Sequence, residues 1–251
     1  VMIHIDEVQN ITDEHARSQL LIALGDALTH EEPTTLPGGL SVGSALPLAV
    51  YLTGLPEFAD MAGARSGATF ARRFQTTTLE TIDDDDLLTA LRPFISQGWP
   101  ITTADGGTER IFMEPDAQRA IVELSCGEPF LFQLAGQYAW HAGTDSIITA
   151  EHVRTGWSRQ AVHEAESHVQ RILDRLPPRE REFVEAMAEL APEERSLTNI
   201  ANRLGLKKAT DAGPTAQRLD LTRRIIRRGR PYRFRHRAVG AYLTSEWPEV
   251  G

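Results

Sequence analysis

Two adjacent carboxylates, Asp6 and Glu7, follow the apolar run VMIHI at residues 1–5. Such a run is typical of a strand buried on both faces of a parallel sheet, and α/β proteins bind ligands at the carboxyl edge of that sheet. An aspartate at this edge can hold Mg²⁺, and a following glutamate can orient and polarise a water molecule. The alternative is that the two acids simply end a strand before a helix.

A second set of residues able to do chemistry lies near the C-terminus, where residues 203–237 carry 12 basic and 2 acidic side chains. Arginine on a helix, with further arginine between aromatic residues on a hairpin, suits phosphate contacts and some base readout in duplex DNA. Contact of the same face with acidic segments of this chain or of another protein is the alternative. The candidate DNA-binding residues are Arg218, Arg223, Arg224, Arg227, Arg228, Arg230, Arg233 and Arg235.

Elements that could position Asp6 and Glu7 are expected in the first 82 residues. A second buried strand is predicted over 46–52, and it ends at Thr53. Residues 33–44 (PTTLPGGLSVGS) predict a loop, since they are rich in proline, glycine, serine and threonine. The other elements expected here are a helix from an N-cap at Thr12 to about His30, a helix over 57–73 and a short extended stretch over 75–79.

The middle of the chain is predicted to be helical. Four acids, Asp83 to Asp86, begin a helix that runs to about Gln97, where they complement the helix dipole. Residues 98–110 are expected to form a loop. Further helices are predicted at about 115–125, 130–142 and 150–173.

The arginine-rich end has its own pattern, which starts after Leu176. Helices are predicted over 179–190, 196–204 and 215–228, with Gly205 and Gly229 ending the last two. Residues 231–236 (PYRFRH) alternate aromatic and basic side chains, as in a β-wing. Three helices followed by a hairpin predict a winged helix.

Composition excludes several classes of protein. The 251 residues have a net charge of −9, which divides into −14 for residues 1–150 and +5 for the remainder. With 41% hydrophobic residues the chain is not disordered throughout, and no apolar run has the ~18 residues of a membrane span. A single cysteine, Cys126, excludes an internal disulfide and a cysteine-based zinc site. We expect a cytoplasmic protein that does not bind membranes.

Five segments in order resemble the AAA+ and STAND ATPases, in particular the bacterial and archaeal branch related to replication initiators. They are IHIDEVQ (3–9), YLTGLPEF (51–58), ARRFQTTTLETI (71–82), SCGEPFLFQLAGQYAW (125–140) and LPPREREFVEAMAEL (176–190). The resemblance implies a mainly α chain with a partial parallel sheet, the remnant of an α/β nucleotide domain. It implies a C-terminal part of the nucleotide core over 1–82, a helical lid over 83–173 and a winged helix over 174–251.

The same resemblance implies roles for single residues. Asp6 and Glu7 match the Walker B motif, in which the aspartate holds Mg²⁺, and Thr53 matches sensor 1. Arg73 falls at the arginine finger, which acts on the γ-phosphate across a subunit interface and implies self-association through the ATPase core. Pro129 matches the lid proline that approaches the nucleotide, and no arginine stands at sensor 2. Pairing of Arg73 with the acids at 83–86, and a plain helix start at Pro129, are the alternatives.

One motif of these ATPases is absent: no G-x-x-x-x-G-K-[ST] occurs in the chain. We therefore expect a C-terminal fragment of a parent that binds ATP and Mg²⁺, whereas this chain alone is expected to bind no nucleotide and to be inactive as an ATPase. The parent is expected to couple ATP to DNA binding or remodelling. The alternative is a STAND-type signalling switch whose winged helix is an autoinhibitory or protein-interaction module.

Overall fold

The computed structural model describes residues 1–54 and 74–249, so the helix expected over 57–73 lies outside the described residues. The chain divides into two compact units, Val1–Leu79 and Glu80–Gly251, which we describe separately. It is mainly helical with a small parallel sheet, which confirms the predicted fold class. No helix in the described ranges is long and apolar enough to cross a membrane.

The first unit contains the predicted pair of strands. In its described part, β1 (Met2–Ile5) pairs in parallel with β4 (Ala49–Leu52), and Ile5 is the register partner of Leu52. The 3₁₀ turn η1 (Val8–Asn10) and helix α1 (Glu14–Thr29) follow β1. The N-cap of α1 is Asp13, whose carboxylate accepts a hydrogen bond from the Ala16 amide at 2.6 Å, so the predicted N-cap at Thr12 is wrong. A carboxylate one residue later is the better acceptor for the free amides of the first turn.

Two other expectations for this unit are wrong. Residues along β1 and β4 alternate between exposed and half-buried, although a doubly buried sheet was expected, because the described elements leave much of the sheet surface uncovered. The expected loop over 33–44 is an antiparallel hairpin of β2 (Glu31–Thr35) and β3 (Ser41–Ala45). Gly38 and Gly39 have positive φ at its turn, a conformation that glycine adopts without steric cost. The exposed strands carry no apolar alternation that would have revealed them.

The second unit begins with a helical subdomain. The predicted acidic helix is α3 (Asp84–Ser96), and it is followed by α4 (Pro115–Ser125), α5 (Pro129–Ala142) and α6 (Ala150–Gly156). The loop expected over 98–110 is wrong, since β5 (Trp99–Thr102) and β6 (Thr108–Met113) form a hairpin, and β7 (Ile147–Ile148) extends it in parallel. The Asp105 side chain accepts hydrogen bonds from Thr103 and Gly107, which closes this tight turn.

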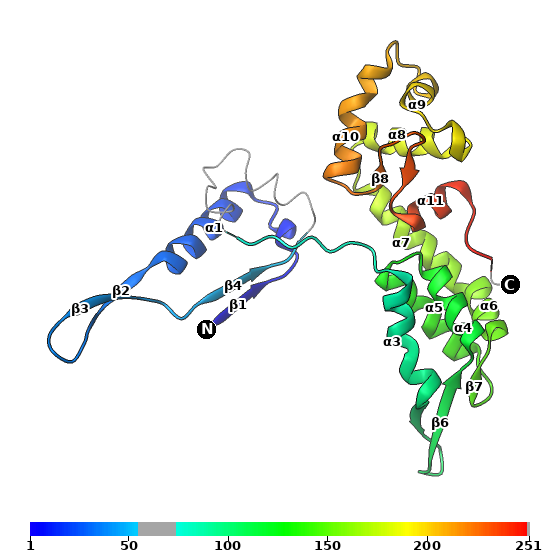
Figure 1. Ribbon diagram of the computed structural model, residues 1–251, viewed down its shortest axis with the longest axis horizontal. Helices are drawn as coiled ribbons and strands as arrows, with labels where there is room; N and C mark the ends of the chain where they lie inside the picture. Colours follow the sequence, from blue (N-terminus) through cyan, green and yellow to red (C-terminus); the bar gives the residue numbers. More distant parts are fainter. Residues whose placement is uncertain (55–73, 250–251) are drawn as a thin grey trace. The chain divides into compact units, whose positions relative to one another are not determined.

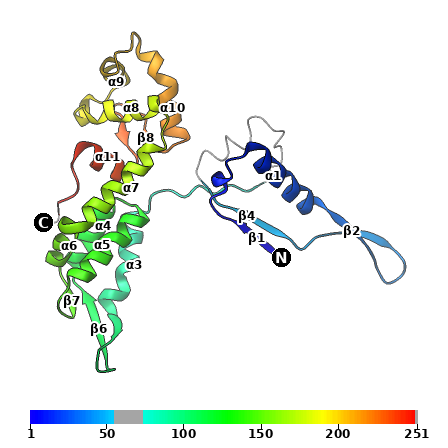
Figure 2. The ribbon, with the colours of Figure 1, turned by 180° about the vertical axis from the view of Figure 1, so that it is seen from behind.

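The helix predicted over 150–173 is divided. After α6 the backbone makes a π-helical turn (Trp157–Ala161) and then continues as α7 (Val162–Asp174). Figures 1 and 2 both show α7 running from α4–α6 towards the elements at the C-terminus. Gly156 lies where α6 crosses α5, since a Cβ placed there would stand 2.4 Å from the Tyr138 carbonyl oxygen.

The C-terminal elements have the order of a winged helix. They are α8 (Pro178–Ala188), the 3₁₀ turn η4 (Pro192–Glu194), α9 (Leu197–Arg203), the 3₁₀ turn η5 (Ala209–Ala212), α10 (Gly213–Leu221), β8 (Ile226–Arg227), β9 (Arg233–Phe234) and α11 (Arg237–Thr244). The helix predicted to reach Arg228 therefore ends at Leu221, and the predicted stop at Gly229 lies in the hairpin loop. Ile225 and Ile226 are both buried, and Ile226 begins β8, where a β-branched side chain favours a strand.

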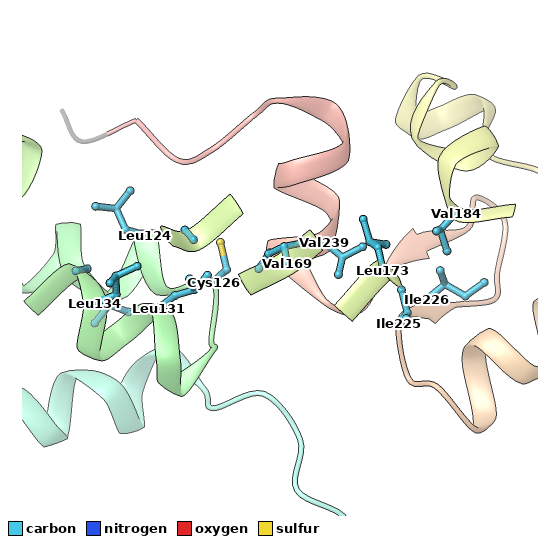
Figure 3. Close-up of a cluster of buried hydrophobic side chains, with 14 of the residues drawn as sticks. Leu124, Cys126, Leu131, Leu134, Val169, Leu173, Val184, Ile225, Ile226 and Val239 are labelled. Carbon is cyan, nitrogen blue, oxygen red and sulfur yellow. The ribbon is translucent and has the colours of Figure 1, made fainter. Parts of the chain in front are cut away.

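One hydrophobic core joins the helical subdomain to the winged helix. Figure 3 shows Val169 and Leu173 of α7 between two groups of buried side chains. Leu124, Leu131 and Leu134 lie on one side, Val184, Ile225 and Ile226 lie on the other, and Val239 of α11 lies beside the two α7 residues. Both α7 residues are fully buried, so this helix belongs to the cores of both parts.

Candidate functional site

Asp6 and Thr53 meet at the carboxyl ends of the two parallel strands. Because Ile5 pairs with Leu52, the next residue of each strand stands at the same edge. The Thr53 hydroxyl donates a hydrogen bond to Asp6 Oδ1, and the Glu7 amide donates to the same oxygen at 3.0 Å. The hydrogen bond from Thr53 is the main cause that lowers the pKa of Asp6 below its ordinary value, so this exposed carboxylate is ionised at neutral pH.

Glu7 stands beside this pair in an uncommon backbone conformation. Its φ of 53° lies in the left-handed region, which is rare for residues other than glycine, asparagine and aspartate. The Gln9 side-chain amide donates a hydrogen bond to its carboxylate. The turn after β1 therefore holds two exposed carboxylates next to a hydroxyl, a donor set that hard cations such as Mg²⁺ accept.

A nucleoside triphosphate needs more than this donor set. The glycine-rich segment 33–44 forms the β2–β3 hairpin, so its amides do not lead into a helix N-terminus that could cradle phosphates. The chain has no G-x-x-x-x-G-K-[ST] sequence. Within the described residues, no group of three histidine, cysteine or acidic side chains is placed to hold a metal ion. Asp6, Glu7 and Thr53 could contribute ligands to a cation, but the residues present do not fit ATP.

The other two residues matched to nucleotide chemistry lie outside the described part of the first unit. Arg73 lies outside the described residues. Pro129 is the first residue of α5, in the second unit, where its fixed φ suits a helix start.

Beside Pro129, Glu128 forms a half-buried acid–imidazole cluster. Its Oε1 lies 3.1 Å from His236 Nε2, and its Oε2 lies 4.0 Å from His168 Nε2. Burial alone would raise the pKa of Glu128, but the two imidazoles more than offset that effect and hold the pKa below its ordinary value. Burial lowers the pKa of His236. The cluster links α5, α7 and the start of α11.

The eight predicted DNA-binding arginines fall into distinct groups, and the first is structural. Glu180, at the start of α8, is 1% exposed and receives Arg223 Nε at 2.8 Å and Arg218 Nε at 3.1 Å. Removing one partner of a buried ion pair leaves an uncompensated charge, which makes these contacts part of the fold. Of the two arginines only Arg218 lies on α10, and its side chain is 60% exposed.

Three further arginines of the predicted set bind carboxylates closer to the surface. Asp220 receives Arg228 Nε at 3.1 Å and Arg235 Nη2 at 3.0 Å, which fastens both ends of the β8–β9 hairpin to α10. Arg224 pairs with Glu80, the first residue of the second unit. Five of the eight arginines thus have carboxylate partners within this chain.

Arg227, Arg230 and Arg233 form the third group, which we call the free wing arginines. All three are exposed, and none forms an ion pair with a described residue. Arg227 and Arg233 are register partners on the antiparallel strands β8 and β9, so their side chains project from the same face of the hairpin. Like charges placed directly opposite one another are destabilising, and a bound anion would relieve that repulsion.

The sequence did not predict the role of Arg195, which helps to position this hairpin, or of the two lysines Lys207 and Lys208. Arg195 is almost fully buried, and its guanidinium lies 5.2 Å from the centre of the Phe234 ring. Its carbonyl oxygen accepts a hydrogen bond from the Tyr232 amide at 2.6 Å. Lys207 and Lys208 are exposed in the loop before η5 and form no ion pair in the described part of the chain. The position of these two lysines between two predicted helices could have indicated that they are exposed.

Comparison with known proteins gives a class of fold and little more. The strand pair, helical subdomain and winged-helix elements define a mainly α protein with a partial parallel sheet. A family model described as a domain of unknown function (DUF8462) matches residues 166–230, which is 65 of the 251 residues. No curated protein matches the chain.

Among solved structures, the chain is similar to the Aeropyrum pernix ORC1 protein in complex with DNA, with 16% sequence identity and a TM-score of 0.41. The match covers 98% of this chain and 64% of that one, so the chain spans less than two thirds of the length of the solved protein. Similarity at this level assigns no function.

Proposed function

We propose that this chain binds duplex DNA through the hairpin of its winged helix, as the C-terminal part of an ATPase of the AAA+ or STAND type. The observation that carries the DNA proposal is the exposed, like-charged pair Arg227 and Arg233, with Arg230 in the loop between them. Three exposed guanidiniums on one short hairpin, with no ion pair among the described residues, suit the phosphate oxygens of a backbone.

The structure of the winged helix favours phosphate contacts over base readout. The helix that would enter the major groove, α10, ends at Leu221, so the arginines from Arg223 onward are not on it. Arg218 is the one arginine of the predicted set on α10, and it is engaged by Glu180. We therefore propose binding of low sequence specificity, supported by Lys207 and Lys208.

The ATPase part of the proposal rests on the Asp6–Thr53 hydrogen bond. In the parent protein Asp6 would hold Mg²⁺ and Glu7 would orient water. Arg73 and Pro129 would contact the nucleotide, and the parent would supply the phosphate-binding loop. In this proposal the chain comprises part of a nucleotide core (1–82), a lid (83–173) and a winged helix (174–251).

Charge removal at the hairpin tests DNA binding. We expect the variant Arg227→Ala/Arg230→Ala/Arg233→Ala to lose most affinity for a fluorescent duplex, measured by anisotropy at graded salt. The slope of log K against log salt should become shallower by about 2.7, since each lost phosphate contact removes about 0.9. The matched control is Arg92→Ala/Arg159→Ala/Arg171→Ala, which removes three exposed arginines from helices α3 and α7 and the turn before α7. Equal losses in both variants would contradict the proposal.

A second function is favoured by a specific observation, the pairing of five candidate arginines inside the chain. In a signalling switch, such contacts would hold the winged helix in place as an autoinhibitory or protein-interaction module. The same titration decides between the two proposals. Absence of duplex binding by the unaltered chain near physiological salt favours the switch.

A further inference from the structure

An acidic segment and a basic segment both line one cleft in the second unit, with a volume of about 780 Å³. The acidic wall comprises the five carboxylates that precede and begin α3: Glu80, Asp83, Asp84, Asp85 and Asp86. The basic wall comprises four arginines of the hairpin and of α11: Arg227, Arg233, Arg235 and Arg237. Two of the free wing arginines therefore face a concentrated set of negative charges.

Two ion pairs hold the acidic wall, one to Arg237 of the basic wall and one to Arg224, which precedes β8 and is not part of the basic wall. Arg237 donates to Asp84 in a bidentate manner, with Nη2–Oδ1 and Nη1–Oδ2 distances of 2.6 and 3.3 Å. This hydrogen bonding is the main cause that raises the pKa of Arg237. Arg224 pairs with Glu80 at the other end of the acidic wall. The acidic wall is itself fixed, because the Ile82 amide donates to the Gly127 carbonyl oxygen at 2.9 Å.

Both ion pairs are accessible to solvent, unlike the Glu180 contacts. The side chains of Arg237 and Asp84 are 47% and 50% exposed, and those of Arg224 and Glu80 are 39% and 59% exposed. An exposed pair shifts an equilibrium by no more than about fivefold, and salt screens it. A DNA backbone, with one charge per about 1.7 Å of helix axis, can compete with two such pairs.

We propose that the acidic wall is an intramolecular competitor of DNA: it occupies the basic wall of the winged helix and must be displaced before phosphates reach Arg227 and Arg233. This inference rests on the proposed DNA binding. It makes the acidic wall a second anion that can contact Arg227 and Arg233. Its negative charge also explains how these two arginines can lie opposite one another in the protein without DNA.

The test is a variant that opens the cleft without touching the arginines. We expect Glu80→Gln/Asp84→Asn to bind a labelled duplex about three- to tenfold more tightly than the unaltered full chain at low salt, with a smaller gain as salt rises. The matched control is Asp116→Asn/Glu151→Gln, which breaks two exposed ion pairs, to Arg119 and Arg154, and changes the net charge equally. The control should change affinity by less than about twofold. Equal gains in both variants, or no gain in either, would overturn the competition.

A second measurement separates this inference from the proposed function. Without DNA, amide hydrogen exchange over residues 224–237 should accelerate in Glu80→Gln/Asp84→Asn and stay unchanged in the control. Unchanged exchange in both would show that the ion pairs do not close the cleft, which overturns the inference even where DNA binds. If exchange accelerates but no variant binds DNA at any salt, then the proposed function fails, and the competition fails with it.

Discussion

Buried and half-buried carboxylates decide how the charged groups of this chain divide between structure and binding. Glu180 and Asp220 each hold two arginines, and Glu128 lies against two imidazoles. Burial raises the pKa of Glu180, and the charge of Arg218 opposes this effect. Because such carboxylates pair with the nearest guanidiniums, the arginines available to bind an external anion are those without such a pair among the described residues.

The Glu128 cluster makes stability depend on pH. Burial depresses the pKa of His236 below its ordinary 6.5, although the charge of Glu128 opposes this; His168, Arg237 and Cys126 are the other titratable groups nearby. Because the imidazole pKa is depressed in the folded protein, the unfolded chain takes up the proton first as pH falls. The contribution of neutral His236 to stability is therefore present above about pH 6.5 and is lost as pH falls.

We therefore expect the free energy of unfolding, measured with urea, to fall between pH 7 and pH 5, and to fall less in His236→Gln. Glutamine keeps an N–H donor for Glu128 but does not titrate. The control is His163→Gln, since the His163 side chain is 77% exposed. A decline in His236→Gln as steep as that of the control would show that His236 is not the responsible group.

Among the elements, α5 and α6 approach each other closely where they cross at Gly156. A methyl group at Gly156 would stand 2.4 Å from the Tyr138 carbonyl oxygen and 3.0 Å from the Ala139 nitrogen, both of which are backbone atoms that cannot rotate away. We expect Gly156→Ala to cost about 2 kcal/mol or more in urea unfolding, since overpacking typically costs 1–3 kcal/mol.

Gly136, inside α5, is the matched control because a Cβ there meets no atom within 4 Å. Alanine should stabilise the protein at this site by about 0.5–1 kcal/mol, the usual difference between the two residues within a helix. Similar destabilisation by both substitutions would contradict the close crossing.

At the level of elements, three predicted helices are confirmed. Those expected from Asp83–Asp86 to about Gln97, over about 115–125 and over 196–204 are observed at Asp84–Ser96, Pro115–Ser125 and Leu197–Arg203. Both missed hairpins have short strands and glycine turns, and their apolar residues are too few to show alternation. The arginine-rich helix was predicted too long because its charge pattern continues through β8, while the burial of Ile225 and Ile226 is set by tertiary packing.

The candidate sites show the same division between local and distant information. Asp6 and Thr53 could be placed at one edge because each ends a strand, and parallel strands share that edge. The ion pairs of the winged helix could not be predicted, since Glu180 lies 43 residues from Arg223 and Glu80 lies 144 from Arg224. Which arginines are free depends on those distant partners.

For the whole molecule, the absence of a phosphate-binding sequence leads to a prediction about ATP. We expect no heat of binding when Mg-ATP is titrated into the full chain in a calorimeter, because neither the β2–β3 turn nor any other segment supplies the required motif. Micromolar affinity would contradict this expectation. The chain should still be folded under the same conditions, as far-UV circular dichroism can verify.

Helix α7 also has a mechanical consequence. Its 13 residues span about 20 Å, with Val169 and Leu173 packed between the helical subdomain and the winged helix. A tilt of about 10° at one end of such a lever displaces the other end by roughly 3 Å. The Arg237–Asp84 contact spans 2.6 Å, so a lever motion of this size would be enough to part the two walls of the cleft.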